Sequence, residues 1–187
     1  MANQWIRPRR QKFVLKDRWG STLFAGGTTL RTAFLELSRV WEPPSLAHVV
    51  ISFPDSRQVI SNVTLRSRID MSNALIEHIE IKKSAFIASD LRLIHVHMCK
   101  LENVTFNGTP LLFSWFANSS FNEVTFTSAI LSFMRLLSCT GDMALSDSLV
   151  GHARFSDSSF EMRVDESSFS LGEMARVYIP EAFISDT

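Results

Sequence analysis

Large apolar residues recur at every fifth position between Met71 and Leu136. Fourteen consecutive positions all hold Met, Ile, Val, Leu or Phe: Met71, Ile76, Ile81, Phe86, Leu91, Val96, Leu101, Phe106, Leu111, Phe116, Phe121, Phe126, Leu131 and Leu136. An α-helix repeats every 3.6 residues and a strand every two, so neither gives a period of five. The pattern requires a coil that points a bulky side chain inward once in every five residues.

A second column of smaller residues lies two positions before each of these centres. Its members are mostly small and uncharged: Ile69, Ala74, Ile79, Ser84, Ser89, Ile94, Cys99, Val104, Thr109, Ser114, Ser119, Val124, Ala129 and Met134. Two of every five residues are therefore expected to face the interior. Fifteen Phe against one Tyr indicate that this interior is dry, because Phe has no polar atom that needs a partner.

The repeat resembles that of the pentapeptide-repeat family, whose unit is a small residue, Asp or Asn, a central Leu or Phe, and two polar residues. The clearest units are Ser84-Ala85-Phe86, Ser89-Asp90-Leu91, Ser119-Ser120-Phe121 and Ser158-Ser159-Phe160. The resemblance implies an all-β solenoid, a right-handed quadrilateral β-helix with twenty residues per coil. Coils would stack at strand spacing, roughly 4.8 Å. It also implies a structural core of Phe86, Leu91, Leu101, Phe106, Leu111, Phe116, Phe121, Phe126, Leu131, Leu136, Phe155 and Phe160.

The register of the repeat changes by one residue after Leu136. It continues with Leu145, Val150, Phe155 and Phe160, and changes again before Val164 and Phe169. We therefore expect a bulge or small loop at residues 140–142. Ile60 and Leu65 form an imperfect lead-in, and about five coils follow.

The solenoid is expected to be flanked by two short segments. Residues 1–57 form an N-terminal cap: a β-hairpin with a turn at Gly20, then a helix capped by Thr28 or Thr29 and stopped by Pro43-Pro44. Residues 58–170 are the β-helix. Residues 171–187 are a C-terminal cap or tail, in which Leu171 to Tyr178 would form a short helix or turn.

Apolar residues also occupy outward positions, where the repeat would place polar ones. When twenty residues make one coil, they gather on one side: Leu75, Leu93, Leu112, Phe113, Trp115, Ile130, Phe133 and Leu137. A contiguous apolar patch on a protein surface usually marks a contact. Three occupants stay open at this point: the folded-back N-terminal segment with Phe34, Leu37 and Trp41, a second copy of the chain, or a different protein.

Other candidate sites are weaker. His78, His95 and His97 would lie on the surface without a convergent carboxylate, so solvated histidines are favoured over a metal site. Cys99 and Cys139 occupy the small inward column and are expected to be buried thiols. No hydroxyl, histidine and carboxylate combine as a catalytic set, and no glycine loop for phosphate is present. We expect no enzyme activity and no cofactor.

The net charge is zero, but it is unevenly spread. Residues 1–45 hold eight Lys/Arg and three Asp/Glu, whereas residues 142–187 hold three and nine. A basic stretch with Arg7, Arg9, Arg10, Lys12 and Arg18 permits contact with nucleic acid, although a solvated arm is favoured. No apolar run approaches the roughly 20 residues of a membrane helix, and the two cysteines suggest no disulfide framework, so a cytoplasmic protein is expected.

These observations favour a non-enzymatic protein-binding or structural module, whose N-terminal arrangement resembles the lead-in of phage and prophage repeat proteins. An alternative comes from family members that modulate type II topoisomerases such as gyrase by imitating DNA. That activity implies a strongly acidic, dimeric rod, whereas the middle coils here are mixed in charge. A bacterial effector is a third alternative.

Overall fold

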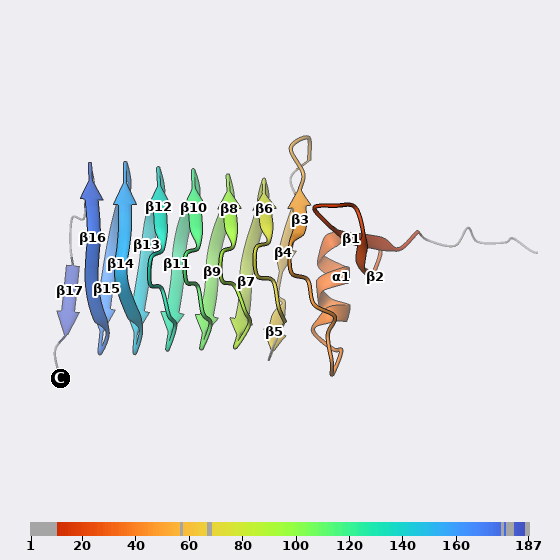
Figure 1. Cartoon of the computed structure of the whole chain (residues 1–187), viewed down its shortest axis with the longest axis horizontal. Coiled ribbons are helices and arrows are strands. Elements are labelled where there is room, and N and C mark those ends of the chain that lie inside the picture. Colours follow the sequence, from red (N-terminus) through yellow and green to blue (C-terminus); the bar gives the residue numbers. More distant parts are fainter. Residues whose placement is uncertain (1–10, 57, 67–68, 177, 179–181, 186–187) are drawn as a thin grey trace, which may run out of the picture.

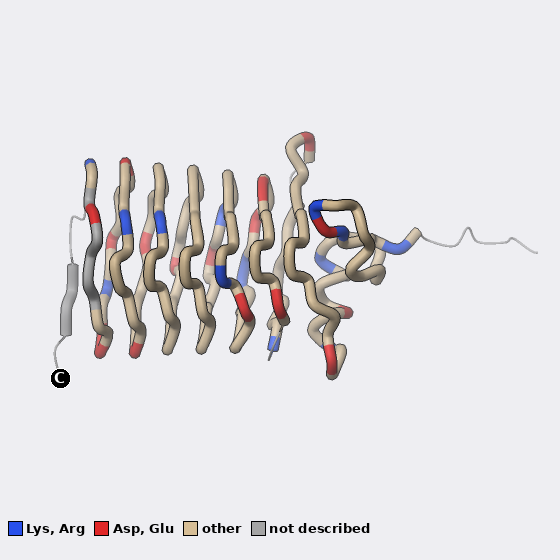
Figure 2. Tube along the Cα trace, in the orientation of Figure 1, with Lys and Arg blue, Asp and Glu red and all other residues tan. Residues whose placement is uncertain are grey.

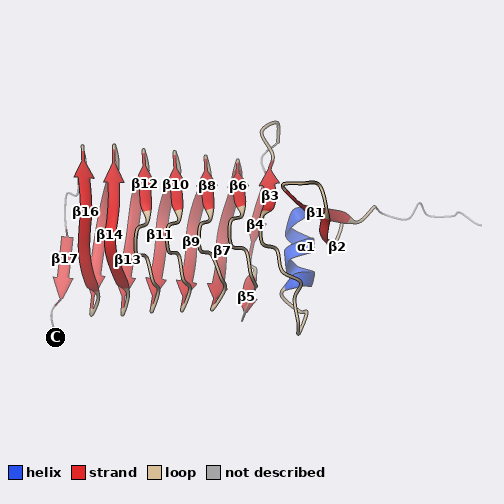
Figure 3. Ribbon diagram, in the orientation of Figure 1, coloured by secondary structure: helices blue, strands red, loops and turns tan. Residues whose placement is uncertain are grey.

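The computed structural model describes residues 11–56, 58–66, 69–176, 178 and 182–185. In this part of the chain the strands run across a long axis and stack along it, with the N-terminal hairpin and helix at one end (Figure 1). Figure 3 shows strands joined by short loops along the whole rod and the one described helix at that end.

Two sheets of mainly parallel strands wrap around a common interior. The first has the order β16-β14-β12-β10-β8-β6-β3-β1-β2, and the second has the order β17-β15-β13-β11-β9-β7-β4, with β5 paired to β7. The first contains β1 (Phe13–Asp17), β2 (Thr22–Gly26), β3 (Val49–Ser52), β6 (Leu75–Glu77), β8 (His95–His97), β10 (Trp115–Ala117), β12 (Arg135–Leu137), β14 (Leu149–Ser156) and β16 (Ser168–Ala175). The second contains β4 (Gln58–Ser61), β5 (Thr64–Arg66), β7 (Ile79–Ile87), β9 (Lys100–Asn107), β11 (Ser120–Thr127), β13 (Thr140–Ser146), β15 (Ser159–Asp165) and β17 (Ala182–Ser185).

Each coil of the regular part contains twenty residues and four sides. Phe116 pairs with Val96 on one neighbouring coil and with Leu136 on the other, twenty residues away in each direction. We number the sides by their central residues: face 1 is centred on Leu91, Leu111 and Leu131, face 2 on Val96, Phe116 and Leu136, face 3 on Leu101 and Phe121, and face 4 on Phe106 and Phe126. The structure is thus a parallel β-solenoid of about five coils, as the period of five predicts.

The corners between faces are made by residues with positive φ. Within one coil they are Leu93, Met98, Asn103 and Gly108, each two positions after a central residue. The left-handed conformation turns the chain sharply, but it costs an L-residue free energy because Cβ meets the carbonyl oxygen. Equivalent corner residues therefore stack in four columns along the rod.

The interior is a continuous apolar core. All twelve residues of the expected core are buried, each with no more than 4% of its surface exposed. Phe86, Phe106 and Phe126 stack along face 4 with ring centroids 5.3 and 5.1 Å apart and planes 11° from parallel. The period-of-five column therefore lies on shared interior lines.

Most polar side chains of the small inward column form their hydrogen bonds with backbone groups. Ser119 donates its hydroxyl to the Ala117 carbonyl at 2.9 Å and accepts the backbone N–H of Cys99 at 3.2 Å. Thr109 donates to the carbonyls of Phe86 and Asn107 at 3.1 Å. Small residues fit here because they tie one corner to the next without displacing the central side chains.

The N-terminal segment closes one end of the solenoid. β1 pairs antiparallel with β2 and with β3, so the hairpin extends the first sheet beyond its first coil. Helix α1 (Leu30–Leu37) starts at Thr29, whose side chain accepts the Thr32 N–H, and buries Leu30, Phe34 and Leu37 against this end. The hairpin and helix α1 thus cover backbone groups of the first coil that would otherwise lack hydrogen-bond partners at this end.

Helix α1 is shorter than its apolar spacing suggests. It ends at Leu37, with Ser38 as the C-cap, so the stop comes before Pro43-Pro44. Successive turns follow, with the N–H of Arg39 bonded to the Glu36 carbonyl and that of Val40 to Leu37. Trp41 falls outside the helix and is 95% exposed.

The shift in register after Leu136 occurs inside a strand. Gly141 lies in β13 and takes the central place opposite Phe121, and the pairing then skips one residue between Phe121 and Val124. From here the coils advance by nineteen residues: Leu136 pairs with Phe155 and Gly141 with Phe160. The bulge or small loop expected at residues 140–142 is this irregularity in β13, a shortened corner at which Gly141 adopts a φ of 126°.

The expectation of a short helix or turn at residues 171–178 is wrong for residues 171–175, which belong to a strand. Residues 168–175 form β16, which pairs in parallel with β14, and β17 pairs with β15. The pairing satisfies the backbone groups of β14 and β15, which a helix would leave open at the edge. The described chain thus continues the solenoid beyond residue 170, and it contains no helix long and apolar enough to cross a membrane.

Candidate functional site: an aromatic corner on the rod

The eight outward apolar residues lie together where face 1 meets face 2. Five of them are more than a third exposed: Phe113 at 53%, Phe133 at 44%, Leu93 at 42%, and Trp115 and Ile130 at 40%. The other three, Leu75, Leu112 and Leu137, are half-buried. Leu149, which the sequence analysis omitted, adds to this group with 47% exposure and pairs with Ile130 on the neighbouring coil. We call these nine residues the apolar surface.

The centre of the apolar surface is a column of corner residues. Leu93, Phe113, Phe133 and His152 all have φ between 54° and 59° and follow one another along consecutive coils. The backbone N–H of Leu93 bonds to Leu112 on the next coil, and those of Phe113 and Phe133 bond likewise to Ser132 and Gly151. We call these four residues the corner ladder.

The rings of the ladder stack on one another. The centroids of Phe113 and Phe133 lie 4.8 Å apart with planes 6° from parallel, and those of Phe133 and His152 lie 5.2 Å apart at 20°. Because ring faces are used within the ladder, ring edges are turned to solvent. Edges carry the positive part of the ring quadrupole and therefore favour the faces of other rings. His152 was missed from sequence because it joins the column only after the nineteen-residue step.

Bulky residues in this column are unusual on conformational grounds. A left-handed backbone favours Gly, Asn and Asp, and a bulky residue there is an outlier. The same chain places Asn73, Asn103 and Asn118 in corner positions, and Lys83, Met98 and Glu123 in others. A large side chain is thus not needed to form a corner, and the stacking of Phe113 on Phe133 sets this column apart from the others.

A shallow groove lies on face 2 beside the ladder. Its volume is about 390 Å³, and its walls include Trp115, Leu137, Leu75 and His97. Ala117, 6% exposed, is the small member of a column whose neighbours are His97 and Leu137. The groove therefore forms a notch over Ala117, with the half-buried Leu137 of the next coil as one of its walls.

Cations border the apolar surface on face 2. Arg135 is exposed and pairs in register with Trp115 on one side and with Arg154 on the other. Arg154 has Glu173 at 3.8 Å. The ring of His95 meets Trp115 edge-on with centroids 5.5 Å apart. Partial burial lowers the pKa of His95, and the charge of Arg18 lowers it further.

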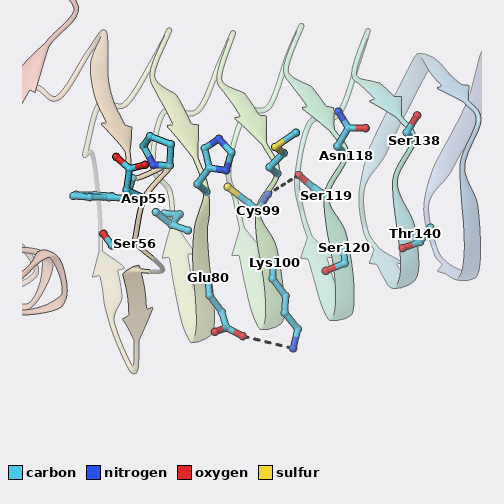
Figure 4. A pocket seen from close by; sticks show the side chains of 15 residues that line it. Asp55, Ser56, Glu80, Cys99, Lys100, Asn118, Ser119, Ser120, Ser138 and Thr140 are labelled. Carbon is cyan, nitrogen blue, oxygen red and sulfur yellow. Dashed lines mark hydrogen bonds and ion pairs between the residues drawn. The ribbon is translucent and has the colours of Figure 1, made fainter.

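A second, polar groove runs along the corner between faces 2 and 3 (Figure 4). Its volume is about 720 Å³, and the β3–β4 loop, with Asp55 and Ser56, stands at one end. Along the groove Figure 4 shows Glu80, Lys100 and Asn118 on successive coils. Sequence analysis did not find this groove, because the loop that bounds it lies outside the repeat.

An ion network on face 3 borders this groove. Lys82 contacts Glu80 at 2.8 Å and Glu102 at 3.1 Å, and Lys100 contacts them at 3.5 and 3.2 Å. The hydrogen bonds that Lys82 donates to Glu80 and Glu102 raise the pKa of Lys82, and those that Glu102 accepts from Lys82 and Lys100 lower the pKa of Glu102. The charges of these middle coils are thus neutralised locally.

The histidines and cysteines lie apart from any set of metal ligands. Within the described part of the chain, no three His, Cys, Asp or Glu side chains are placed to hold a metal ion. The Nδ1 atom of His97 lies 3.6 Å from a carboxylate oxygen of Glu77, twenty residues earlier, a neighbour that the sequence analysis missed. Cys99 and Cys139 are buried, and burial raises the pKa of each thiol to about 11.

The described part of the N-terminal segment does not cover the apolar surface. Phe34 and Leu37 are buried in the core at the end of the rod, and Figure 1 shows α1 beyond the first coils. The idea that Phe34, Leu37 and Trp41 lie over Phe113 and Phe133 is therefore wrong. The basic residues Arg7, Arg9 and Arg10 lie outside the described residues, whereas Arg18 donates to the Asn73 carbonyl at 2.9 Å.

The fold and its repeat define a class of protein: a parallel β-solenoid with four-sided coils and a period of five. No protein-family model and no curated protein matches the sequence. Among solved structures, the chain is similar to trypsin-treated QnrB1, a plasmid-mediated fluoroquinolone resistance protein, with 12% identity and a TM-score of 0.44 over 60% of this chain and 68% of that one. It is similar to HetL, a pentapeptide-repeat protein involved in heterocyst differentiation regulation in the cyanobacterium Nostoc, with 7% identity and a TM-score of 0.32 over 68% and 90%.

A third similar structure is a putative glycosyl hydrolase from Parabacteroides merdae, with 8% identity and a TM-score of 0.35 over 73% of this chain and 81% of that one. These similarities concern fold. The period of five, the four left-handed corners per coil and the two inward columns give the chain the repeat architecture that its resemblance to pentapeptide-repeat proteins implies.

Proposed function

We propose that this chain is a non-enzymatic interaction module that binds a protein partner through the apolar surface. The observation that carries the proposal is the corner ladder: two stacked phenylalanines, each about half exposed, held at positions where the backbone favours Asn or Gly. Aromatic residues dominate protein–protein contacts because they bury a large area at a small entropic cost.

The rod suits this role because its surface is preformed. The backbone of Leu93, Phe113 and Phe133 is fixed by hydrogen bonds to the next coil, so little conformational entropy is lost when a partner binds. The notch above Ala117 offers a recess beside the ladder for one apolar side chain. The ladder offers a partner apolar contact area, and the adjacent notch fixes the position at which the partner binds.

The alternative of a DNA-mimicking topoisomerase modulator receives less support from the charges. Mimicry of a duplex requires continuous acidic columns, but Glu80 and Glu102 are paired with lysines and Asp90 is paired with Arg92. Figure 2 shows acidic and basic positions mixed along the coils. A gyrase supercoiling assay separates the two functions, since the interaction module should leave supercoiling unchanged.

The test of the proposal compares three purified proteins as baits: the wild type, the double variant Phe113→Asn/Phe133→Asn, and the control Lys83→Asn. Lys83 is an exposed corner residue with φ 45° between faces 3 and 4, away from the ladder. A protein captured by the wild type is purified and titrated against all three. We expect at least ten-fold weaker binding to the double variant alone; equal binding to all three would refute the proposal.

A further inference from the structure

We infer that the apolar surface binds a second copy of the chain, with the two rods antiparallel and the two-fold axis between the coils of Phe113 and Phe133. This inference rests on the proposed function, because it names an occupant for the same surface. It follows from self-complementarity in three neighbouring columns and from the distribution of charge along the rod.

The ladder supplies the first match. An antiparallel two-fold axis at this level places Phe113 of each copy opposite Phe133 of the other. Leu93 then lies opposite His152, so all four ladder positions meet apolar or aromatic partners. The exposed ring edges of the two ladders then meet and bury apolar area between the copies, while the ring faces stay stacked within each ladder.

Face 2 supplies the second and third matches. Ala117 and Leu137 occupy the same column one coil apart, so the axis places each Leu137 above the notch at the other Ala117. Trp115 and Arg135 are likewise one coil apart in the next column, which places each guanidinium on the other indole. Arg over Trp is a favourable cation–π pair. The same two-fold axis therefore pairs Leu137 with the notch at Ala117 and Arg135 with Trp115.

The charge distribution selects antiparallel rods over parallel ones. Described residues 11–45 hold five Lys/Arg and three Asp/Glu, a net charge of +2, whereas residues 142–176 hold three Arg and seven Asp/Glu, a net charge of −4. Parallel rods would bring like ends together. Antiparallel rods place the basic end of each copy beside the acidic end of the other, which favours association. The zero net charge of the whole chain adds no overall repulsion.

The contact between the two copies is small, so we expect it to be weak. From Asn73 to Glu173 it covers five coil steps, about 24 Å at strand spacing. A contact of this length with a few aromatic anchors belongs to the weaker class of interfaces, with dissociation constants on the order of 1–100 µM. Association is therefore expected only at elevated concentration.

The first measurement is the mass of the full chain in solution, by light scattering or sedimentation equilibrium, at concentrations from about 1 to 500 µM. We expect the mass to rise from 21.2 kDa towards twice that value. Phe113→Asn/Phe133→Asn should weaken association at least ten-fold, and Lys83→Asn should not change it. A wild type that stays monomeric, or a dimer that is indifferent to the double variant, would overturn the inference.

The second measurement fixes the direction of the rods. A spin label is attached to Asn73→Cys, in the first coil of the ladder column, while Cys99 and Cys139 stay unlabelled because they are buried. Antiparallel rods separate the two labels by about 24 Å along the axis, whereas parallel rods bring them side by side. A short distance would overturn the arrangement. A monomeric wild type that still loses a captured partner through the double variant would leave the proposed function standing without the dimer.

Discussion

Phe113 and Phe133 stack face to face 4.8 Å apart on the outside of the rod, in the same geometry as Phe106 and Phe126, which stack 5.1 Å apart inside it. The coil spacing sets both distances, since equivalent residues of successive coils lie one strand apart. Phe106 and Phe126 stack because they fill the core. Phe113 and Phe133 fill no core, and this contrast is the basis of the predictions for the ladder.

Truncating the two stacks should have different consequences for stability. Phe126→Ala removes a side chain with 0% exposure and leaves a cavity, so we expect the free energy of unfolding to fall by about 3–5 kcal/mol. Phe113→Ala should cost only about 0.5–1.5 kcal/mol, the value of an aromatic pair, because the ring is already half exposed. Urea denaturation of both variants measures the difference. Equal losses would mean that Phe113 is a structural residue.

Gly141 should tolerate no side chain. A Cβ there would overlap the Phe121 carbonyl, and the φ of 126° is open only to glycine. We expect Gly141→Ala to lower the free energy of unfolding by about 3 kcal/mol or more. Gly108→Ala is the matched control: it has φ 58° with open space around the added atom, and should cost about 1 kcal/mol. A Gly141 variant as stable as the Gly108 variant would disprove the shortened corner.

The two thiols should be inert in the folded protein. Burial raises the pKa of Cys99 and Cys139 to about 11, so at about pH 8 only roughly one thiol in a thousand is ionised. Folded protein should react with a disulfide reagent only at its rate of unfolding, and two thiols should react at once in denaturant. Rapid reaction of either thiol in native buffer would show that it is accessible.

His95 should titrate below its ordinary value. Partial burial and the charge of Arg18 both lower the pKa of His95 from 6.5. The folded state then binds a proton less readily than the unfolded state, so this histidine contributes stability above about pH 6.5 that is lost as the pH falls through 6.5 to its folded pKa. An NMR titration should give a midpoint below 6.5, and Arg18→Gln should raise it. A midpoint at or above 6.5 would contradict this assignment.

The interior of this protein is predictable from sequence because its period is local. Each central residue is five positions from the next, so Phe86, Phe106 and Phe126 can be assigned to one stack by counting. Surface neighbours follow in the same way where the coil is twenty residues long. The pairs Glu77–His97 and Glu80–Lys100 each join residues twenty apart, and a search at that interval finds both.

Features that break the period are harder to predict. The β3–β4 loop near Asp55 lies outside the repeat, so the polar groove that it bounds has no sequence signal. The nineteen-residue coil after Leu136, which the change in register predicts and the pairing of Leu136 with Phe155 confirms, moves His152 into the ladder, but His152 was missed because the outward column was followed only as far as Phe133. The segment after Phe169 was expected to form a short helix or turn, because a short apolar run does not distinguish a strand from a helix without its neighbours in space.

The most direct test of the account is the Phe113→Asn/Phe133→Asn variant, measured for both stability and association. Asn relieves the left-handed backbone, by about 1 kcal/mol per residue, while loss of stacking costs a similar amount. We therefore expect the free energy of unfolding to stay within about 1 kcal/mol of the wild type, and association through this surface to weaken at least ten-fold. A variant that unfolds several kcal/mol more easily, yet associates as the wild type does, would show that the ladder serves the fold alone.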